Sequence, residues 1–119
     1  MEQMDVVSAL AALAQEHRLA AFRLLVQAGH KGLAAGEVAA ALNMAPNTLS
    51  FHLERLRQAR LVTFERHGRS LVYAARFDTM EALLGYLTDN CCDGHPELCR
   101  PPACVPAKPA AKRKKEPAS

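Results

Sequence analysis

A proline-initiated helix followed at once by a β-hairpin is the feature that most limits the folds open to this chain. Pro46 suits the first turn of a helix, where its missing N–H leaves no hydrogen bond unmade. The helix after it has one apolar stripe, formed by Leu49, Leu53 and Leu56. The β-prone runs 61–65 and 71–75 enclose a polar turn centred on His67-Gly68-Arg69, which predicts a hairpin.

Apolar spacing places four more helices around this unit. The spacing of Val6, Leu10 and Leu13 predicts a first amphipathic helix over residues 4–15, and a second helix ends near Gly29. A short alanine-rich third helix is marked by Leu33, Val38, Ala39 and Leu42. The last helix is expected over residues 77–87. The predicted fold is therefore mainly α with a β-hairpin, in the order α-α-α-α-β-β-α, which is a winged helix-turn-helix.

The charge is unevenly distributed along the chain. Its formal net charge is +3, but the segment from Lys108 onward has five basic residues against Glu116, or +4, which leaves −1 for the rest. Within that rest, residues 55–76 carry six arginines against the single acid Glu65. A basic region on a nearly neutral body predicts one face that binds a polyanion such as double-stranded DNA.

Two sets of side chains are candidates for contacting that DNA. The exposed positions of the fourth helix can reach base edges or phosphates, and they are Asn47, Thr48, Ser50, Phe51 and Arg55. The tip of the hairpin, or wing, can contact the sugar-phosphate backbone through Arg66, His67 and Arg69. His52 flanks the leucine stripe, and we interpret it as a structural histidine at the edge of the core.

The chain divides into three segments. Residues 1–90 are expected to form the DNA-binding and dimerisation domain, residues 91–104 are rich in cysteine, and residues 105–119 form a basic tail expected to be disordered. We find no transmembrane stretch and no signal peptide, so a cytoplasmic protein is expected. Cytoplasmic thiols stay reduced, so the four clustered cysteines predict a metal, metalloid or redox site.

The segment NTLSFHLERLRQARLVTFERHGRSLVYA resembles the ArsR/SmtB family of bacterial metal-sensing repressors. The matching positions are Ser50, His52, Leu53, Leu56, Leu61-Val62, Arg66, Gly68-Arg69 and Tyr73. The resemblance covers roughly residues 5–90. It implies a homodimer, formed mainly by the first and last helices, that represses transcription by occupying a palindromic operator.

Three departures from the family pattern bear on function. Many arsenic sensors of the family have a Cys-x-Cys pair at the start of the third helix, where this chain has LAAGEV. Zinc sensors of the family have Asp and His ligands on the last helix, and TMEALLGYLTDN contains no histidine. The residue before Leu61 is usually glycine, and here it is Arg60, which should cost about 1 kcal/mol in a left-handed conformation.

With both common sensing sites absent, the cysteine cluster becomes the candidate inducer site. Soft thiolates select thiophilic ions, and trivalent arsenic takes three sulfur ligands. We assign Cys91, Cys92 and Cys99 as that triad, with Cys104 as a spare or alternate ligand. Adjacent side chains diverge on a helix, so binding is expected to reshape the end of the last helix. Some family members use such a C-terminal pair plus a later cysteine for As(III).

The expected function is a repressor of an arsenic-resistance operon, released from DNA by As(III), with Sb(III), methylarsenite or Cd(II) as alternative inducers and no organic cofactor. Three other roles for the cysteines remain open. They are a Cd/Zn/Pb site, which could also use His95 as a ligand; a thiol redox switch; and no function at all. A winged helix that binds protein in place of DNA is a further alternative. No catalytic constellation is evident, so an enzyme is not expected.

Overall fold

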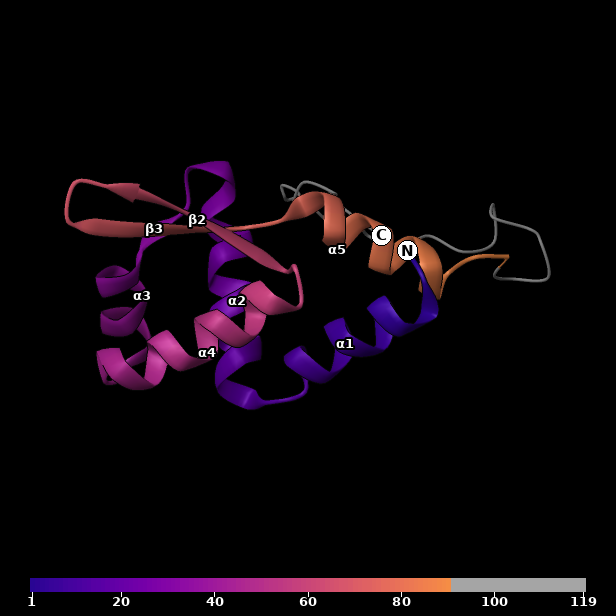
Figure 1. Ribbon diagram of the computed structural model, residues 1–119, viewed down its shortest axis with the longest axis horizontal. Coiled ribbons are helices and arrows are strands. Elements are labelled where there is room, and N and C mark those ends of the chain that lie inside the picture. The colour runs from indigo at the N-terminus through magenta and orange to yellow at the C-terminus, as the bar shows by residue number, and fades with distance from the viewer. Residues whose placement is uncertain (91–119) are drawn as a thin grey trace, which may run out of the picture. The chain divides into compact units, whose positions relative to one another are not determined.

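The computed structural model describes residues 1–90, of which Met1–Leu87 form one structural unit. Its helices and strands, in chain order, are α1 (Gln3–Leu13), α2 (Glu16–Ala28), the 3₁₀ turn η1 (Gly29–Lys31), β1 (Leu33–Ala34), α3 (Ala35–Leu42), α4 (Pro46–Gln58), β2 (Val62–His67), β3 (Ser70–Ala75) and α5 (Phe77–Leu87). Figure 1 shows α1 and α5 extending from the side of this unit opposite the β2–β3 turn. The winged helix-turn-helix prediction is confirmed. None of the described helices is long and apolar enough to span a bilayer.

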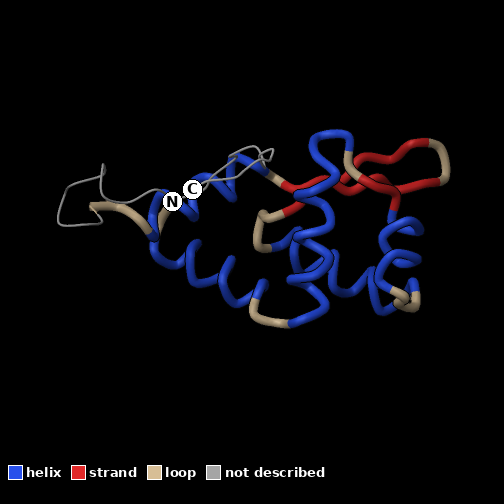
Figure 2. Tube along the Cα trace, turned by 180° about the vertical axis from the view of Figure 1, so that it is seen from behind, coloured by secondary structure: helices blue, strands red, loops and turns tan. Residues whose placement is uncertain are grey.

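The wing is a two-stranded hairpin with a very short turn. β2 and β3 pair antiparallel from Val62–Ala75 to His67–Ser70, so Gly68 and Arg69 alone connect them (Figure 2). Gly68 has φ +64°, as a type II′ hairpin turn requires at its first central position. The hairpin was predicted, although β2 extends two residues beyond the expected run.

A third strand was not predicted. Leu33 was expected to begin the third helix, but Leu33 and Ala34 form β1 and pair with Tyr73 and Val72 of β3. The sheet therefore has the order β1-β3-β2. Gly32 permits this pairing, because it has φ +69° and a Cβ there would lie 2.2 Å from the Tyr73 carbonyl oxygen. A two-residue strand has no periodicity by which the sequence could reveal it.

The core lies where α2, α3 and α4 meet the sheet. Its largest fully buried side chains are Leu25, Val38, Leu49, Leu53, Leu56, Leu61 and Val62. Helix α1 packs mainly through small residues, because Val6, Ala9 and Ala12 are buried while Leu10 is 42% exposed. Its expected apolar stripe of Val6, Leu10 and Leu13 thus only partly faces the core.

Helices α3 and α4 end in the same way, with one residue in the left-handed region. After α3, Asn43 has φ +52°, and the Met44 N–H donates to the Ala39 carbonyl at 2.9 Å. After α4, Arg60 has φ +63°, and the Leu61 N–H donates to the Leu56 carbonyl at 3.0 Å. Both are Schellman closures, which normally favour glycine or asparagine. Arg60 therefore meets the condition under which its backbone is expected to cost about 1 kcal/mol.

We predict that Gly32→Ala will strongly destabilise the domain. The new Cβ would clash with the Tyr73 backbone, and alanine is strained at positive φ. Together these effects should cost about 2 kcal/mol or more, which lowers the melting temperature by about 8 °C or more. Thermal unfolding followed by circular dichroism measures this. Gly36→Ala is the matched control, because Gly36 lies in α3 with open space around it and should gain stability. Equal melting temperatures for the two variants would contradict the account of β1.

We predict the opposite sign for Arg60→Gly. Glycine adopts the left-handed region without strain, so the variant should be more stable by up to about 1 kcal/mol. Urea unfolding measures this difference. Asn43→Gly should change the free energy of unfolding less, because asparagine already tolerates positive φ. A loss of stability in Arg60→Gly would show that the arginine side chain stabilises the fold by more than its backbone costs.

Candidate nucleic-acid interface

Helix α4 is held so that one face is buried and the other faces solvent. It begins at Pro46 after an extended Ala45, and it packs on α2 and α3. Leu49, Leu53 and Leu56 are at most 1% exposed, as their spacing predicts. The short turn after α3, closed at Asn43, fixes where α4 starts. The arrangement is a helix-turn-helix with α4 in the position of the recognition helix.

All the candidate contacts on α4 are on its solvent face. Asn47, Thr48, Ser50, Phe51 and Arg55 are all exposed. Phe51 is 59% exposed, and the Arg55 guanidinium carbon lies 5.8 Å from the centroid of its ring. A cation–π contact of this kind orients the arginine while leaving its N–H groups available to a phosphate or a base. The exposure of these residues is as predicted, and their contacts with DNA remain predictions.

His52 is buried and ties α4 to the beginning of α2. It is 8% exposed, and the Arg18 Nη1 donates to its Nδ1 at 3.4 Å. The Arg18 Nε also donates to the Ala12 carbonyl at 2.7 Å, so one guanidinium joins the end of α1 to α4. Burial lowers the pKa of His52, and the nearby charges of Arg18 and His17 lower it further, so the ring stays neutral and accepts the bond. The interpretation of His52 as structural is confirmed, while its partner Arg18 was not foreseen.

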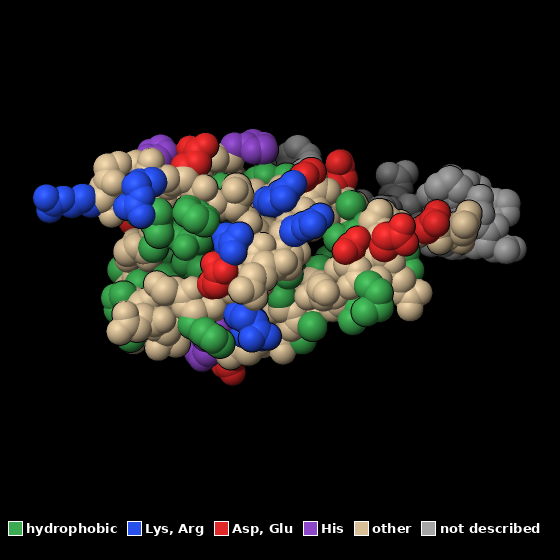
Figure 3. Space-filling model, viewed as in Figure 1, with side chains coloured by type: hydrophobic (Ala, Val, Ile, Leu, Met, Phe, Trp, Pro, Cys, Tyr) green, Lys and Arg blue, Asp and Glu red, His purple; other side chains and the backbone are tan. Residues whose placement is uncertain are grey.

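The wing carries its basic groups at its tip. Arg66, His67 and Arg69 are all exposed, and Arg69 is in the two-residue turn itself. His67 Nε2 lies 3.2 Å from Glu65 Oε1, so the imidazole already has a hydrogen-bond partner on its own strand. In Figure 3 a basic side chain projects from the end of the molecule that Figure 1 identifies as the wing. The tip is thus suited to phosphates, as expected.

The predicted inducer site is not among the described residues. Cys91, Cys92, Cys99 and Cys104 lie beyond residue 90. Within residues 1–90, no group of three or more His, Cys, Asp or Glu side chains could hold a metal ion. Helix α5 ends at Leu87, and Asn90 has φ +57°. The expectation that binding reshapes the end of the last helix therefore stays a prediction, because the thiols lie outside the described residues.

Comparison with known proteins agrees with this geometry. Residues 13–63 match a family model described as a helix-turn-helix domain. The chain is 38% identical over 77 residues to YceK, an uncharacterised HTH-type transcriptional regulator of Bacillus subtilis; the match covers 64% of this chain and 76% of YceK. It is also 49% identical over 39 residues to the HTH-type regulator YdfF of the same species. That match covers 33% of this chain and only 17% of YdfF.

A solved structure shows the same architecture. It is a homodimeric winged helix-turn-helix DNA-binding domain from Mycobacterium bovis, described as a possible ArsR-family transcriptional regulator. The TM-score is 0.59 at 28% identity, and the match covers 82% of this chain and 86% of that one. The match to YceK, this structure and the exposed face of α4 lead to one conclusion. The chain belongs to the HTH-type transcriptional regulators, and its winged helix-turn-helix fold is similar to that of a possible ArsR-family regulator.

Proposed function

We propose that this protein is a homodimeric repressor that occupies an operator and leaves it when trivalent arsenic or antimony binds its cysteine cluster. The observation that carries the DNA-binding half is the solvent face of α4, where Asn47, Ser50 and Arg55 are exposed beside a basic wing. A helix of this width fits the major groove, and a hairpin tip fits the adjacent backbone. The wing arginines then position the protein, while α4 reads base edges.

Exposed apolar side chains on α1 and α5 support dimerisation through these helices. Val7 and Leu10 of α1 are 49% and 42% exposed, and Leu87 of α5 is 55% exposed. Large apolar groups gathered on adjoining helices favour burial against a second surface. The M. bovis structure is a homodimer. A two-fold dimer would present two α4 helices about one turn of DNA apart, which suits a palindromic operator.

The inducer half of the proposal is supported by the chemistry of the cluster. Four thiols in fourteen residues provide the three soft ligands that As(III) or Sb(III) requires, and we assign Cys91, Cys92 and Cys99. Cys91 follows the last residue of α5 by only four positions. Drawing the thiolates together therefore pulls directly on a helix of the proposed dimer interface. A coupling free energy of roughly 1–3 kcal/mol would be enough to lower operator occupancy.

We predict that Asn47→Ala and Arg69→Ala will weaken DNA binding in different ways. Loss of a base contact by Asn47→Ala should cost about 1–3 kcal/mol of discrimination between the operator and a scrambled duplex. Loss of a phosphate contact by Arg69→Ala should weaken binding to both duplexes alike. Fluorescence anisotropy with the chain's own upstream DNA measures both. Gln27→Ala, which removes an exposed amide from α2, is the control and should change neither value. An unaltered operator preference in Asn47→Ala would remove Asn47 from the reading surface.

We predict that As(III) or methylarsenite will release the reduced protein from DNA, and that Cys91→Ser and Cys92→Ser will each abolish release. Serine keeps the size of the side chain but removes the thiolate that bonds arsenic. The same anisotropy assay measures release, with Cys104→Ser as the matched control expected to keep most of it. Release by Cd(II) or Zn(II) but not by arsenicals would favour a metal sensor. Release by oxidant alone would favour a redox switch, and induction that survives both serine variants would refute the assigned triad.

A further inference from the structure

A hollow beside the end of α4 is lined by arginines from three parts of the fold. Arg57 is in the last turn of α4, Arg60 follows that helix, and Arg76 joins β3 to α5. All three line a hollow of about 310 Å³ beside β2, together with Thr63 and Phe64. We call Arg57, Arg60 and Arg76 the arginine triplet. Guanidinium groups that converge from separate elements are suited to a phosphate, which accepts several N–H donors at once.

Two members of the triplet are already neutralised, and one is not. Arg57 Nη2 is 2.6 Å from Glu54 Oε2, and Arg76 Nη2 is 2.8 Å from Asp78 Oδ2. Among the residues that the structure describes, no side chain forms a hydrogen bond or ion pair with the Arg60 guanidinium. Three guanidinium groups against two carboxylates leave a local charge of +1. The unpaired cation belongs to Arg60.

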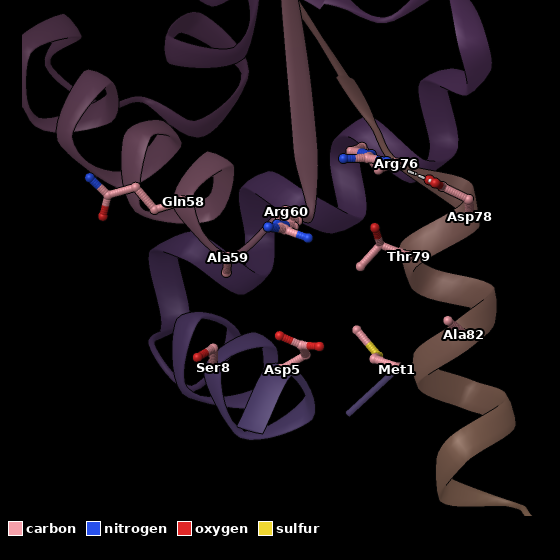
Figure 4. A pocket seen from close by; sticks show the side chains of 10 residues that line it. All are labelled: Met1, Asp5, Ser8, Gln58, Ala59, Arg60, Arg76, Asp78, Thr79 and Ala82. Carbon is pink, nitrogen blue, oxygen red and sulfur yellow. Dashed lines mark hydrogen bonds and ion pairs between the residues drawn. The ribbon is translucent and has the colours of Figure 1, made fainter. Parts of the chain in front are cut away.

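Arg60 has a second hollow on its other side, so the side chain is accessible from two directions. This hollow of about 450 Å³ lies between α1, α5 and the end of α4. In Figure 4 Arg60 and Arg76 lie along one side of it, and Asp5 of α1 lies across from Arg60. Asp5 accepts the Glu2 N–H at 3.2 Å and thereby caps α1. Asp5 thus caps α1 and forms no ion pair with Arg60, although both side chains line this hollow.

The backbone of Arg60 gives an independent reason to assign its side chain a role. Arg60 closes α4 at φ +63°, where glycine would be unstrained and arginine costs about 1 kcal/mol. Strain of this size persists where the side chain contributes something that the easier residue lacks. Glycine at this position would remove the only unpaired charge of the triplet.

The triplet continues the proposed DNA-facing surface. Its member Arg57 and the hollow-lining Gln58 belong to α4, the helix that presents Asn47 and Ser50 nearer its beginning. Figure 3 shows basic side chains spread across this one face of the molecule, from the wing end toward the end from which α1 and α5 extend. In the proposed dimer, that direction leads toward the two-fold axis. A phosphate there would lie between the two half-sites.

We propose that Arg60, supported by Arg57 and Arg76, binds a backbone phosphate of the operator on the side of α4 that lies toward α5. This contact rests on the proposed function and adds a third point of attachment to α4 and the wing. It holds the protein on DNA without reading sequence, because phosphates are the same in every base pair. With arginine at position 60, the fold lacks the stability that glycine would provide there, but the protein gains affinity for DNA.

The test is the salt dependence of DNA binding by Arg60→Gly in the full chain. Each phosphate contact contributes about 0.9 to the slope of log K against log salt concentration, so two protomers should lose about 2. The loss should be the same on operator and scrambled DNA.

Arg60→Lys should keep most of the slope, because the charge stays. Arg23→Ala, which removes an exposed arginine of α2 that lines neither hollow, should keep the slope of the wild type. Arg60→Gly remains folded, since glycine suits this position, so a weaker complex is not a folding defect.

Several results would overturn the proposal. An unchanged slope in Arg60→Gly would exclude the contact while leaving the proposed repressor intact. The slope could also stay unchanged while the DNA-free wild-type protein binds inorganic phosphate, seen as ³¹P line broadening that Arg60→Gly abolishes. That pair of results would assign the hollow to a free anion and not to DNA. A wild-type protein that binds no DNA would remove the proposed function and this inference together.

Discussion

Burial of the leucine stripe of α4 is the interaction on which the rest of the structure depends. Leu49, Leu53 and Leu56 are at most 1% exposed, and α4 contacts α1, α2, α3 and β2. Burying three such side chains contributes roughly 5–9 kcal/mol, which is comparable to the whole net stability of a small domain. Because these residues share one face, their burial turns the opposite face of α4 outward. The exposure of Asn47, Ser50 and Phe51 is therefore a consequence of core packing.

The two ends of α4 show how much local backbone geometry contributes to that placement. At the beginning, the left-handed Asn43 closes α3 and lets Pro46 start a new helix three residues later. At the end, the left-handed Arg60 closes α4 and sends Leu61 directly into the core. Asparagine accepts this conformation readily, whereas arginine does not. The same kind of helix closure is thus made by a structural asparagine before α4 and by a strained, charged arginine after it.

Much of the fold was predictable, because its signals are periodic. The leucine spacing of α4 and the β-prone runs around Gly68 each repeat over several residues, so burial and pairing follow from them. Three features lacked such a signal. β1 has two residues and depends on Gly32 fitting against Tyr73, α1 buries alanines where leucines were expected to dominate, and the Arg18–His52 contact joins residues 34 positions apart.

The candidate site was predictable to a different extent in each of its parts. The exposed residues of α4 and the wing follow directly from the helical wheel and the hairpin turn. The arginine triplet does not, because Arg57, Arg60 and Arg76 come from separate elements that only the tertiary structure brings together. The unusual residue at position 60 was visible in the sequence as a departure from a glycine pattern. Its unpaired charge was not, since pairing of Arg57 and Arg76 depends on side-chain geometry.

The measurement that tests the central claim most directly is a hydroxyl-radical footprint of the reduced protein on its own upstream DNA. A dimer that inserts two α4 helices should protect two symmetry-related half-sites whose centres lie about 10 base pairs, or one helical turn, apart. The backbone between them should also be protected, because the proposed dimer would place the arginine triplet toward its two-fold axis. Uniform protection along the fragment, or none at all, would contradict the account of α4 and the wing as an operator-reading surface.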